Sequence, residues 1–321
     1  MKRGLPPRIL LVGVGYFGKR HFQVLKDFDD QGLISLVGAV VATDKSKREI
    51  EKRYSIKVFT RLSRKLLNSV DGVDVVTPIA SHYGVVKKCL DYTAVIVEKP
   101  LADTSRRAQA LVKLTQKKRC PLMVGHIFRF NEAVRKLKVL LARSTAGPYL
   151  IEGEFITPGL PEKNVGAILT FMHHFDILDF LLGGKLPLAV YAQTQNNIRH
   201  SSVWEDKALV VLLYGGGVNA VVLLGWGGFK KTRTITLHFK KQNIFCDLLS
   251  QEIKITPTRG GIKKINFHQP EPLRRELETF IRLVSGAKVS YPDARVGERV
   301  VTVCEAAKKS ALKNKVVYLG V

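Results

Sequence analysis

Residues 8–18 read Arg-Ile-Leu-Leu-Val-Gly-Val-Gly-Tyr-Phe-Gly, an apolar run that breaks directly into Gly-x-Gly-x-x-Gly. The apolar part is typical of a parallel strand covered on both faces. Gly13 allows the tight turn off this strand, Gly15 leaves no Cβ between the backbone and a pyrophosphate, and Gly18 lets the next helix pack closely. The stretch therefore predicts a dinucleotide-binding loop, and a glycine-rich turn without a ligand is the alternative.

The helix after this loop is expected to begin near Tyr16 and Phe17. Its first amide groups and its dipole favour an anion. The apolar side chains that follow, Phe22, Leu25 and Phe28 among them, have the spacing of an amphipathic helix. A glycine triplet between a buried strand and such a helix is a stronger signal than the triplet alone.

The composition bounds the class of protein. The chain has 321 residues and 45% apolar residues, enough for two domains and a large core. We expect no membrane span, because no apolar run approaches the length of about eighteen residues that one requires. The basic start before an apolar run is explained better by the glycine motif than by a signal peptide. Four separated cysteines favour buried thiols in a reducing cytoplasm over zinc ligands or disulfides, and no metal site is predicted.

The charge balance is strongly basic, with 52 Lys and Arg against 27 Asp and Glu, a formal net charge of +25. Basic pairs such as Lys87-Lys88, Lys230-Lys231 and Lys308-Lys309 are spread along the whole chain. This distribution argues against a dedicated nucleic-acid site. It favours a field that attracts anionic substrates.

Short apolar strands alternate with helical stretches through residues 8–125. The expected strands are residues 9–12, 36–41, 73–77, 94–97 and 121–124, and two of the expected helices are residues 83–90 and 105–117. This alternation predicts an α/β fold with a doubly wound parallel sheet in a first domain, residues 1–125. Ligands of such sheets bind beyond the carboxyl ends of the strands.

The remaining residues, 126–321, are predicted to form an α+β domain with a large, mainly antiparallel, open-faced sheet. Expected strands are residues 149–156, 189–194, 206–214, 217–226, 232–239, 243–248 and 316–319. Expected helices are residues 131–141, 167–182, 272–283 and 293–312, the last packing back on the first domain. The strands around residues 210–213 and 221–224 are apolar without a polar break, so both faces need cover, and a homodimer or homotetramer is expected.

Four motifs in order resemble the glucose–fructose oxidoreductase / inositol dehydrogenase (Gfo/Idh/MocA) family. They are the glycine loop with His21, Thr77-Pro78 followed by His82, Glu98-Lys99-Pro100, and the segment of residues 123–131. The last of these resembles the domain crossover of the nucleotide-sugar branch. The resemblance implies a Rossmann domain, NAD or NADP as cofactor, and a sugar substrate carried on a nucleotide, such as UDP-N-acetylglucosamine.

The resemblance also implies roles for particular residues. Lys99 would hydrogen-bond the reacting oxygen, as oxidation of a secondary alcohol requires, and Glu98 would pair with Lys99 or the cofactor. Thr77, Pro78 and His82 are expected at the cofactor. The substrate contacts carried over from the crossover segment are His126, Arg129 and Asn131. An exposed loop lysine is the alternative for Lys99.

The general base implied by the family's His-x-x-Asp helix is His173, with Asp176 as its companion. Counting from Gly166 favours His174 instead, and the two side chains point about 100° apart on a helix. Many family members carry Asp four residues before the histidine, where this chain has Leu169 or Thr170. This departure leaves two hypotheses, an active dehydrogenase and a catalytically weakened family member with a sensing role.

The choice between NAD and NADP depends on the end of the second strand, residues 41–48. An NAD site holds an acid there, and the first acid is Asp44, next to Thr43. Asp44 is late and has the alternative of capping the following helix. Ala42 leaves room for a 2′-phosphate that Lys45, Lys47 or Arg48 would neutralise, so NADP is slightly favoured.

Overall fold

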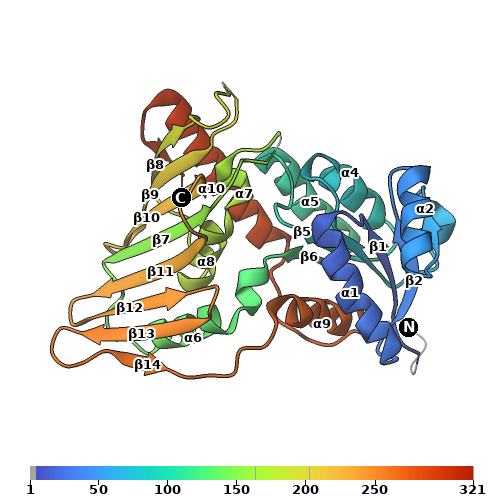
Figure 1. The fold of residues 1–321 in the computed structure, drawn as a ribbon, viewed down its shortest axis with the longest axis horizontal. Coiled ribbons are helices and arrows are strands. Elements are labelled where there is room, and N and C mark those ends of the chain that lie inside the picture. Colours follow the sequence, from blue (N-terminus) through green and yellow to red (C-terminus); the bar gives the residue numbers. More distant parts are fainter. Residues whose placement is uncertain (1–4, 163, 202, 321) are drawn as a thin grey trace. The chain divides into compact units, whose positions relative to one another are not determined.

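The chain divides into two compact units in a computed structural model that describes residues 5–162, 164–201 and 203–320 (Figure 1). The first unit comprises Met1–Ile127 and Glu271–Glu298. The second comprises Phe128–Pro270 and Arg299–Val321. A segment from the second half of the chain, residues 271–298, thus belongs to the first unit.

The first unit contains a six-stranded sheet in the order β3-β2-β1-β4-β5-β6, with every neighbouring pair parallel. Its strands are β1 (Arg8–Val12), β2 (Ser35–Val40), β3 (Val58–Phe59), β4 (Gly72–Val75), β5 (Ala94–Glu98) and β6 (Leu122–Gly125). Leu10, Val73 and Val95 are fully buried in its central strands. The predicted doubly wound parallel sheet is confirmed.

Helices connect these strands, because parallel neighbours require crossover connections. They are α1 (Tyr16–Asp30), α2 (Asp44–Arg53), α3 (Arg64–Leu67), α4 (Ile79–Cys89) and α5 (Ser105–Lys118), and α9 (Pro272–Val284) packs against α1. The inner stripe of α1 is Phe22, Leu25 and Phe28, all buried, as the spacing predicts.

The second unit contains a nine-stranded sheet in the order β14-β13-β12-β11-β7-β10-β9-β8-β15. Its strands are β7 (Leu150–Thr157), β8 (Ala189–Gln195), β9 (Lys207–Leu213), β10 (Asn219–Trp226), β11 (Thr232–Phe239), β12 (Gln242–Asp247), β13 (Glu252–Pro257), β14 (Lys263–Ile265) and β15 (Val317–Tyr318). Among the described residues of this sheet, only β7 and β10 pair in parallel, and the other neighbouring strands pair antiparallel. The predicted mainly antiparallel sheet is confirmed.

One face of this sheet is covered and the other is open. Val210 and Leu212 are fully buried on the covered face, whereas Leu209 and Leu213, which alternate with them, are 44% and 40% exposed. Helices α6 (Glu132–Ala142), α7 (Ala167–Thr170) and α8 (His173–Leu181) contact strands of the sheet or one another, and a 3-10 turn, η1 (Ile127–Phe130), precedes them. The long helix α10 (Ala294–Lys313) joins the second unit from Arg299 onward.

The single helix predicted for residues 167–182 is wrong. Helix α7 ends at Thr170 and α8 begins at His173. Between them, the Phe171 ring packs 4.7 Å from Trp226 and 5.7 Å from Phe155, measured between ring centroids. The helix is interrupted where this aromatic ring is buried against the sheet. The positions of His173 and His174 on one continuous helix that starts at Gly166 therefore do not give the directions of their side chains.

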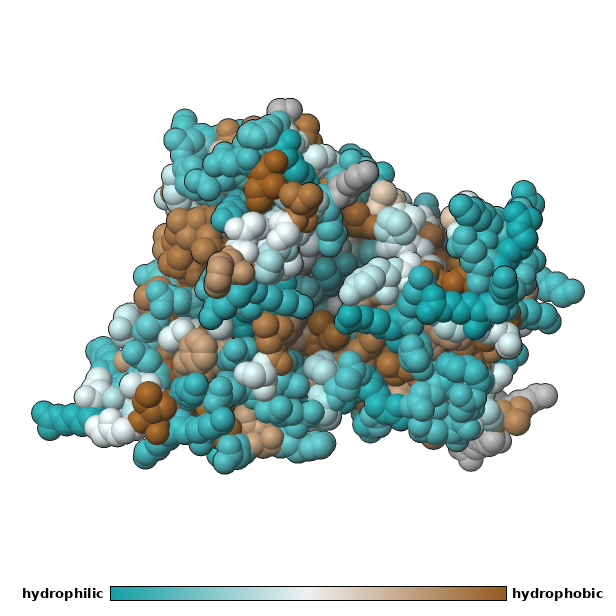
Figure 2. Space-filling model, viewed as in Figure 1, coloured by the Kyte–Doolittle hydropathy of each residue, from teal (hydrophilic) through white to brown (hydrophobic). Residues whose placement is uncertain are grey.

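No helix among the described residues is both long enough and apolar enough to cross a membrane. Hydrophilic side chains predominate on the face shown in Figure 2, and the apolar ones form small separate patches.

Candidate active site

The glycine loop of the first unit leaves open space beside the backbone at Gly15. A Cβ built on Gly15 has no heavy atom within 4 Å, whereas one on Gly13 would lie 2.3 Å from the Val76 carbonyl oxygen and one on Gly18 would lie 2.3 Å from the Gly13 carbonyl oxygen. Gly13 also has φ +98°, the left-handed region that favours glycine. Gly13 and Gly18 are therefore required by packing and Gly15 is not, which is expected where a ligand approaches the backbone.

Helix α1 begins directly after this space. Gly15 is its N-cap residue, no side chain of the described residues caps it, and its first turn holds no acid. Tyr16 is 80% exposed, and its hydroxyl accepts a hydrogen bond from Arg20 at 3.1 Å. Phe17 packs edge-on to the ring of His21, 5.0 Å away. Uncapped amides beside a bare glycine fit the pyrophosphate of a dinucleotide.

Thr43, after β2, is the cap of helix α2. Its hydroxyl accepts the Ser46 N–H at 3.1 Å. The alternative in which Asp44 caps this helix is therefore wrong. Asp44 lies exposed in the first turn, beside exposed Lys45. Both an acid for a ribose and bases for a 2′-phosphate are available at this end of the strand.

His82 forms hydrogen bonds with the segments that follow β4 and β5. Its Nδ1 lies 2.7 Å from the Pro100 carbonyl oxygen and its Nε2 lies 2.7 Å from the Thr77 carbonyl oxygen. Burial lowers the pKa of His82, although both carbonyls favour a ring that donates from each nitrogen. Thr77 also accepts a hydrogen bond from Ser81, and the Lys99–Pro100 peptide is cis. His82 thus supports the loop that carries Lys99 rather than pointing to solvent.

Glu98 belongs to a buried charged cluster. His21 Nδ1 lies 2.8 Å from Asp74 Oδ2, and His21 Nε2 lies 3.3 Å from Glu98 Oε1. Burial opposes charge on His21, but Asp74 and Glu98 outweigh it and raise the pKa of His21 well above its usual value. The second carboxylate oxygen of Glu98 accepts the backbone N–H of Lys99 at 3.2 Å. The cluster therefore fixes the residue next to Lys99 from two other elements, α1 and β4.

His173 and His174 of the second unit have different surroundings. His174 is fully buried, and its Nε2 lies 2.8 Å from the Thr234 carbonyl oxygen. Burial lowers the pKa of His174 to about 4. A Cβ on Gly153 would lie 2.1 Å from the His174 ring, so this glycine provides the space for it. The sheet thus encloses His174 completely.

His173 is half-buried and stacks on the Phe155 ring at 5.0 Å, with an interplanar angle of 27°. Phe128 packs edge-on to it at 4.9 Å. Of the two histidines, His173 has the partial exposure that a proton-transfer group needs.

Asp176 and Arg129 form part of an ion-pair chain. Arg129 Nε donates to Asp176 Oδ1 at 2.6 Å and its Nη2 donates to Asp179 Oδ2 at 2.6 Å. Arg299 Nε donates to Asp179 Oδ1 at 2.5 Å. Burial raises the pKa of Asp179, but the two arginines outweigh it and lower that pKa overall. Asp176, predicted as a companion of His173, is therefore bonded to Arg129, itself a predicted substrate contact.

The other two predicted substrate contacts are buried. Asn131 caps α6, since its Oδ1 accepts the Val134 N–H at 3.3 Å, and its Nδ2 donates to the Leu248 carbonyl at 3.2 Å. His126, after β6, is 1% exposed. Asn131 is thus engaged in holding the helix to the sheet.

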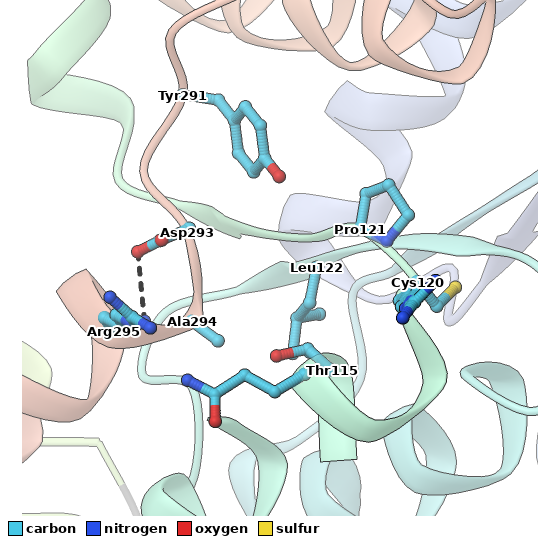
Figure 3. Close-up of a pocket in the computed structure, with 10 residues that line it drawn as sticks. Thr115, Cys120, Pro121, Leu122, Tyr291, Asp293, Ala294 and Arg295 are labelled. Atoms are coloured by element: carbon cyan, nitrogen blue, oxygen red, sulfur yellow. Dashed lines mark hydrogen bonds between the residues drawn. The ribbon is translucent and has the colours of Figure 1, made fainter. Parts of the chain in front are cut away.

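A cavity of about 290 Å³ lies in the first unit (Figure 3). Its lining includes Cys120, Tyr291 and Arg295, and Pro121 places it at the start of β6. The predicted cofactor residues of this unit follow the carboxyl ends of its parallel strands, whereas the cavity lies where β6 begins, at the opposite end of the strands. This cavity is therefore not the candidate active site.

The predictions from sequence missed two charged residues, Asp74 and Arg233. Asp74 is fully buried on β4 and Arg233 is 6% exposed on β11. Each occupies a position that the strand pattern assigns to the core. A charged residue among buried strand positions was the available signal.

The comparisons with known proteins agree with this arrangement. Residues 7–126 match the family model described as an oxidoreductase family with an NAD-binding Rossmann fold. UDP-N-acetylglucosamine 3-dehydrogenase of Acidithiobacillus ferrooxidans is 22% identical over 302 residues, 91% of this chain and 93% of that protein. Its solved structure has a TM-score of 0.84 and covers 95% of this chain and 98% of its own.

Two further proteins are similar over nearly the whole chain. Inositol 2-dehydrogenase of Rhizobium meliloti is 23% identical over 342 aligned positions, 98% of this chain and 99% of that protein. Levoglucosan dehydrogenase, solved with NADH and levoglucosan, has a TM-score of 0.87 at 18% identity and covers 98% of this chain and 100% of its own.

Proposed function

We propose that this member of the Gfo/Idh/MocA family, a nicotinamide-dependent oxidoreductase, oxidises or reduces a secondary alcohol of a nucleotide-linked sugar. The observation that carries the proposal is the glycine loop, with open space at Gly15 before an uncapped helix. When bound there, the nicotinamide cofactor supplies the site that accepts or gives the hydride.

Lys99 is the residue proposed to bind the reacting oxygen. It follows Glu98 at the end of β5, and its backbone is fixed by Glu98. An ammonium group at this place stabilises the negative charge that develops on the alcohol oxygen. The buried cluster of His21, Asp74 and Glu98 gives this loop the rigidity that such a role requires.

His173 is the residue proposed to take the hydroxyl proton. Its partial exposure and its contacts with two aromatic rings fit a positioned imidazole, whereas His174 is enclosed. Asp176 contributes indirectly, by holding Arg129 beside the start of α8. Among the three proposed substrate contacts, Arg129, His126 and Asn131, the first offers a charged group that is not fully buried.

The nucleotide-linked substrate is supported by the similarity to the UDP-N-acetylglucosamine 3-dehydrogenase of A. ferrooxidans and by the net charge of +25. A basic surface concentrates anionic ligands. NADP is the proposed preference between the two cofactors, since Ala42, Lys45 and Arg48 leave room and positive charge for a 2′-phosphate. A homodimer or homotetramer is proposed from the apolar open face of the sheet.

A second candidate function is sensing without turnover. Leu169 and Thr170 stand where many family members carry Asp before the histidine, and both lie in α7, a separate helix from α8. This chain therefore offers no carboxylate at those two positions. A dehydrogenase transfers hydride with a sugar substrate, whereas a sensor binds the same ligands without doing so.

Calorimetric titration with NADH and NADPH tests the cofactor site. Gly15→Val fills the open space with a branched side chain and should abolish measurable binding. Gly84→Val adds the same side chain at another glycine with open space around it, and should bind as the wild type does. Equal affinity in all three proteins would overturn the site.

A further inference from the structure

Arg233 is a buried cation on the covered face of the second unit's sheet. It is 6% exposed and lies on β11 in register with Phe155 of β7, among buried positions such as Ile235 and Leu237. Arginine is rarely buried to this extent without a carboxylate partner, because removing its charge from water is costly.

The contacts of Arg233 are all with neutral groups. Its Nη1 donates to the carbonyl oxygens of Ile156 at 2.6 Å and Thr232 at 2.8 Å, and its Nη2 donates to the Thr157 hydroxyl at 2.5 Å. The guanidinium carbon lies 3.5 Å from the centroid of the Phe155 ring. No carboxylate of the described residues pairs with it, and burial alone lowers the pKa of Arg233 to about 10.

Other enclosed arginines in this unit are neutralised. Arg129 is bonded to Asp176 and Asp179, and Arg299 also bonds Asp179. Arg199 bonds Asp206 at 2.6 Å. Arg233 departs from this pattern although it is the least exposed of the four, since its charge meets only oxygen acceptors without a charge and the rings of Phe155 and Phe171.

The donors that remain on Arg233 suit an anion. A guanidinium has five N–H donors, and the bonds above use three of them. The two left are the Nε hydrogen and one Nη2 hydrogen, and these nitrogens share one edge of the planar group. Two donors on one edge match a carboxylate or a phosphate with two parallel hydrogen bonds.

Arg233 and the proposed base contact the same aromatic ring. The Phe155 ring that contacts its guanidinium is the ring on which His173 stacks at 5.0 Å. Thr157, at the end of β7, is half-buried and provides the accessible end of the cluster. An anionic group bound at Arg233 would therefore lie one aromatic ring away from His173.

We propose that Arg233 and the Thr157 hydroxyl bind an oxyanion of the substrate, either a phosphate of a nucleotide-linked sugar or the carboxylate of a sugar acid. The inference rests on the proposed function, which places the substrate beside His173. It deepens that proposal by naming the group that recognises substrate charge. The ligand's negative charge supplies the counter-ion that the chain lacks.

Calorimetry on the full chain with saturating NADH tests this site, using UDP, D-glucuronate and neutral D-glucose as probes. Arg233→Met removes the charge and keeps the length of the side chain. It should weaken binding of UDP or D-glucuronate by about tenfold or more and leave D-glucose unchanged. The probe that loses affinity identifies phosphate or carboxylate as the group bound.

Lys231→Met is the matched control, since it removes one positive charge at an exposed position two residues away. It should change UDP affinity by less than about twofold. Arg233→Lys keeps the charge and loses the two-donor edge, so it should weaken anion binding by roughly fivefold. This variant replaces Arg233→Met in the test if Arg233→Met does not fold.

Two results would overturn the anion site: unchanged binding of both anions in both Arg233 variants, or wild-type protein that binds neither UDP nor D-glucuronate. Failure of the proposed function can be distinguished from failure of the anion site. NADH titration and hydride transfer would then fail, while anion binding at Arg233 would still be measurable without turnover.

Discussion

His21 Nδ1 lies 2.8 Å from Asp74 Oδ2, and both side chains are fully buried. Because Glu98 adds a second carboxylate at 3.3 Å, the histidine is held as an imidazolium between two acids. The pair connects α1, which begins at the glycine loop, with β4, and the contact of His21 with Glu98 adds β5, the strand that leads into Lys99. We infer that it links the geometry of the cofactor loop to that of the proposed catalytic lysine.

Replacement of His21 should be strongly destabilising. His21→Gln leaves two carboxylates buried without their cation, which costs about 3–5 kcal/mol of the free energy of unfolding. Urea denaturation at pH 7 measures this loss. His238→Gln is a matched control, because His238 pairs with Glu152 at the surface, and it should cost at most about 1 kcal/mol.

The contribution of His21 to the free energy of unfolding should depend on pH. Its pKa is raised in the folded state, so the stabilisation is complete below the unfolded pKa of about 6.5 and is lost as pH rises through the raised pKa. The stability gap between wild type and His21→Gln should therefore narrow at alkaline pH. A gap that stays constant from pH 6 to pH 10 would contradict a charged His21.

The contribution of His174 to the free energy of unfolding should change with pH in the opposite direction to that of His21. Its pKa falls to about 4 in the folded state, so its contribution is present above about pH 6.5 and is lost as pH falls towards 4. Between pH 7 and pH 4.5 the wild type should lose about 2–3 kcal/mol relative to His174→Asn, which has no imidazole to protonate. Urea denaturation at both pH values measures the change. His268→Asn, at an exposed position, should follow the wild type, and parallel loss in all three proteins would refute the buried neutral ring.

Replacement of His173 and replacement of His174 should have different effects on the pH dependence of kcat/KM. If His173 takes the proton, His173→Asn should abolish the rise of kcat/KM with pH near about 6.5. His174→Asn should keep that rise, since its ring is enclosed and bonded to the Thr234 carbonyl. Steady-state rates from pH 5 to pH 9 test this. Loss of the rise only in His174→Asn would transfer the role to His174.

The open face of the second sheet should bind a second copy of the chain. Leu209 and Leu223 lie opposite each other on β9 and β10 and are 44% and 40% exposed. Light scattering should give a mass that is a multiple of 35.8 kDa for the wild type. Leu209→Lys should shift it to the monomer, whereas Leu312→Lys, on α10, should not. A wild-type mass of 35.8 kDa would end this proposal.

The sequence was sufficient where one local pattern determines the structure. The glycine loop and the buried strand before it lie within residues 8–18, so their geometry could be predicted from spacing alone. The His21–Asp74 pair could not, because its partners are 53 residues apart and meet only when the sheet has formed. Arg233 is similar, since its isolation becomes visible only when its neighbours are known.

The break between α7 and α8 shows a different limit. The local sequence favours one helix, but the Phe171 ring is buried against Trp226 and Phe155 of the sheet. Tertiary packing overrides local propensity there. The break affects the candidate active site, because α8 begins anew at His173. The directions of His173 and His174 therefore do not follow from the start of α7.

The most direct test of the account is hydride transfer itself, followed by nicotinamide absorbance with NAD and NADP and a panel of nucleotide-linked and free sugars. The wild type should turn over at least one nucleotide-linked sugar. Lys99→Ala should lower kcat/KM for it by about a hundredfold or more while NADPH affinity changes little, and Lys87→Ala, at an exposed helix position, should behave as the wild type. A Lys99→Ala enzyme with full activity, or a wild type that binds cofactor and sugar without any hydride transfer, would contradict it.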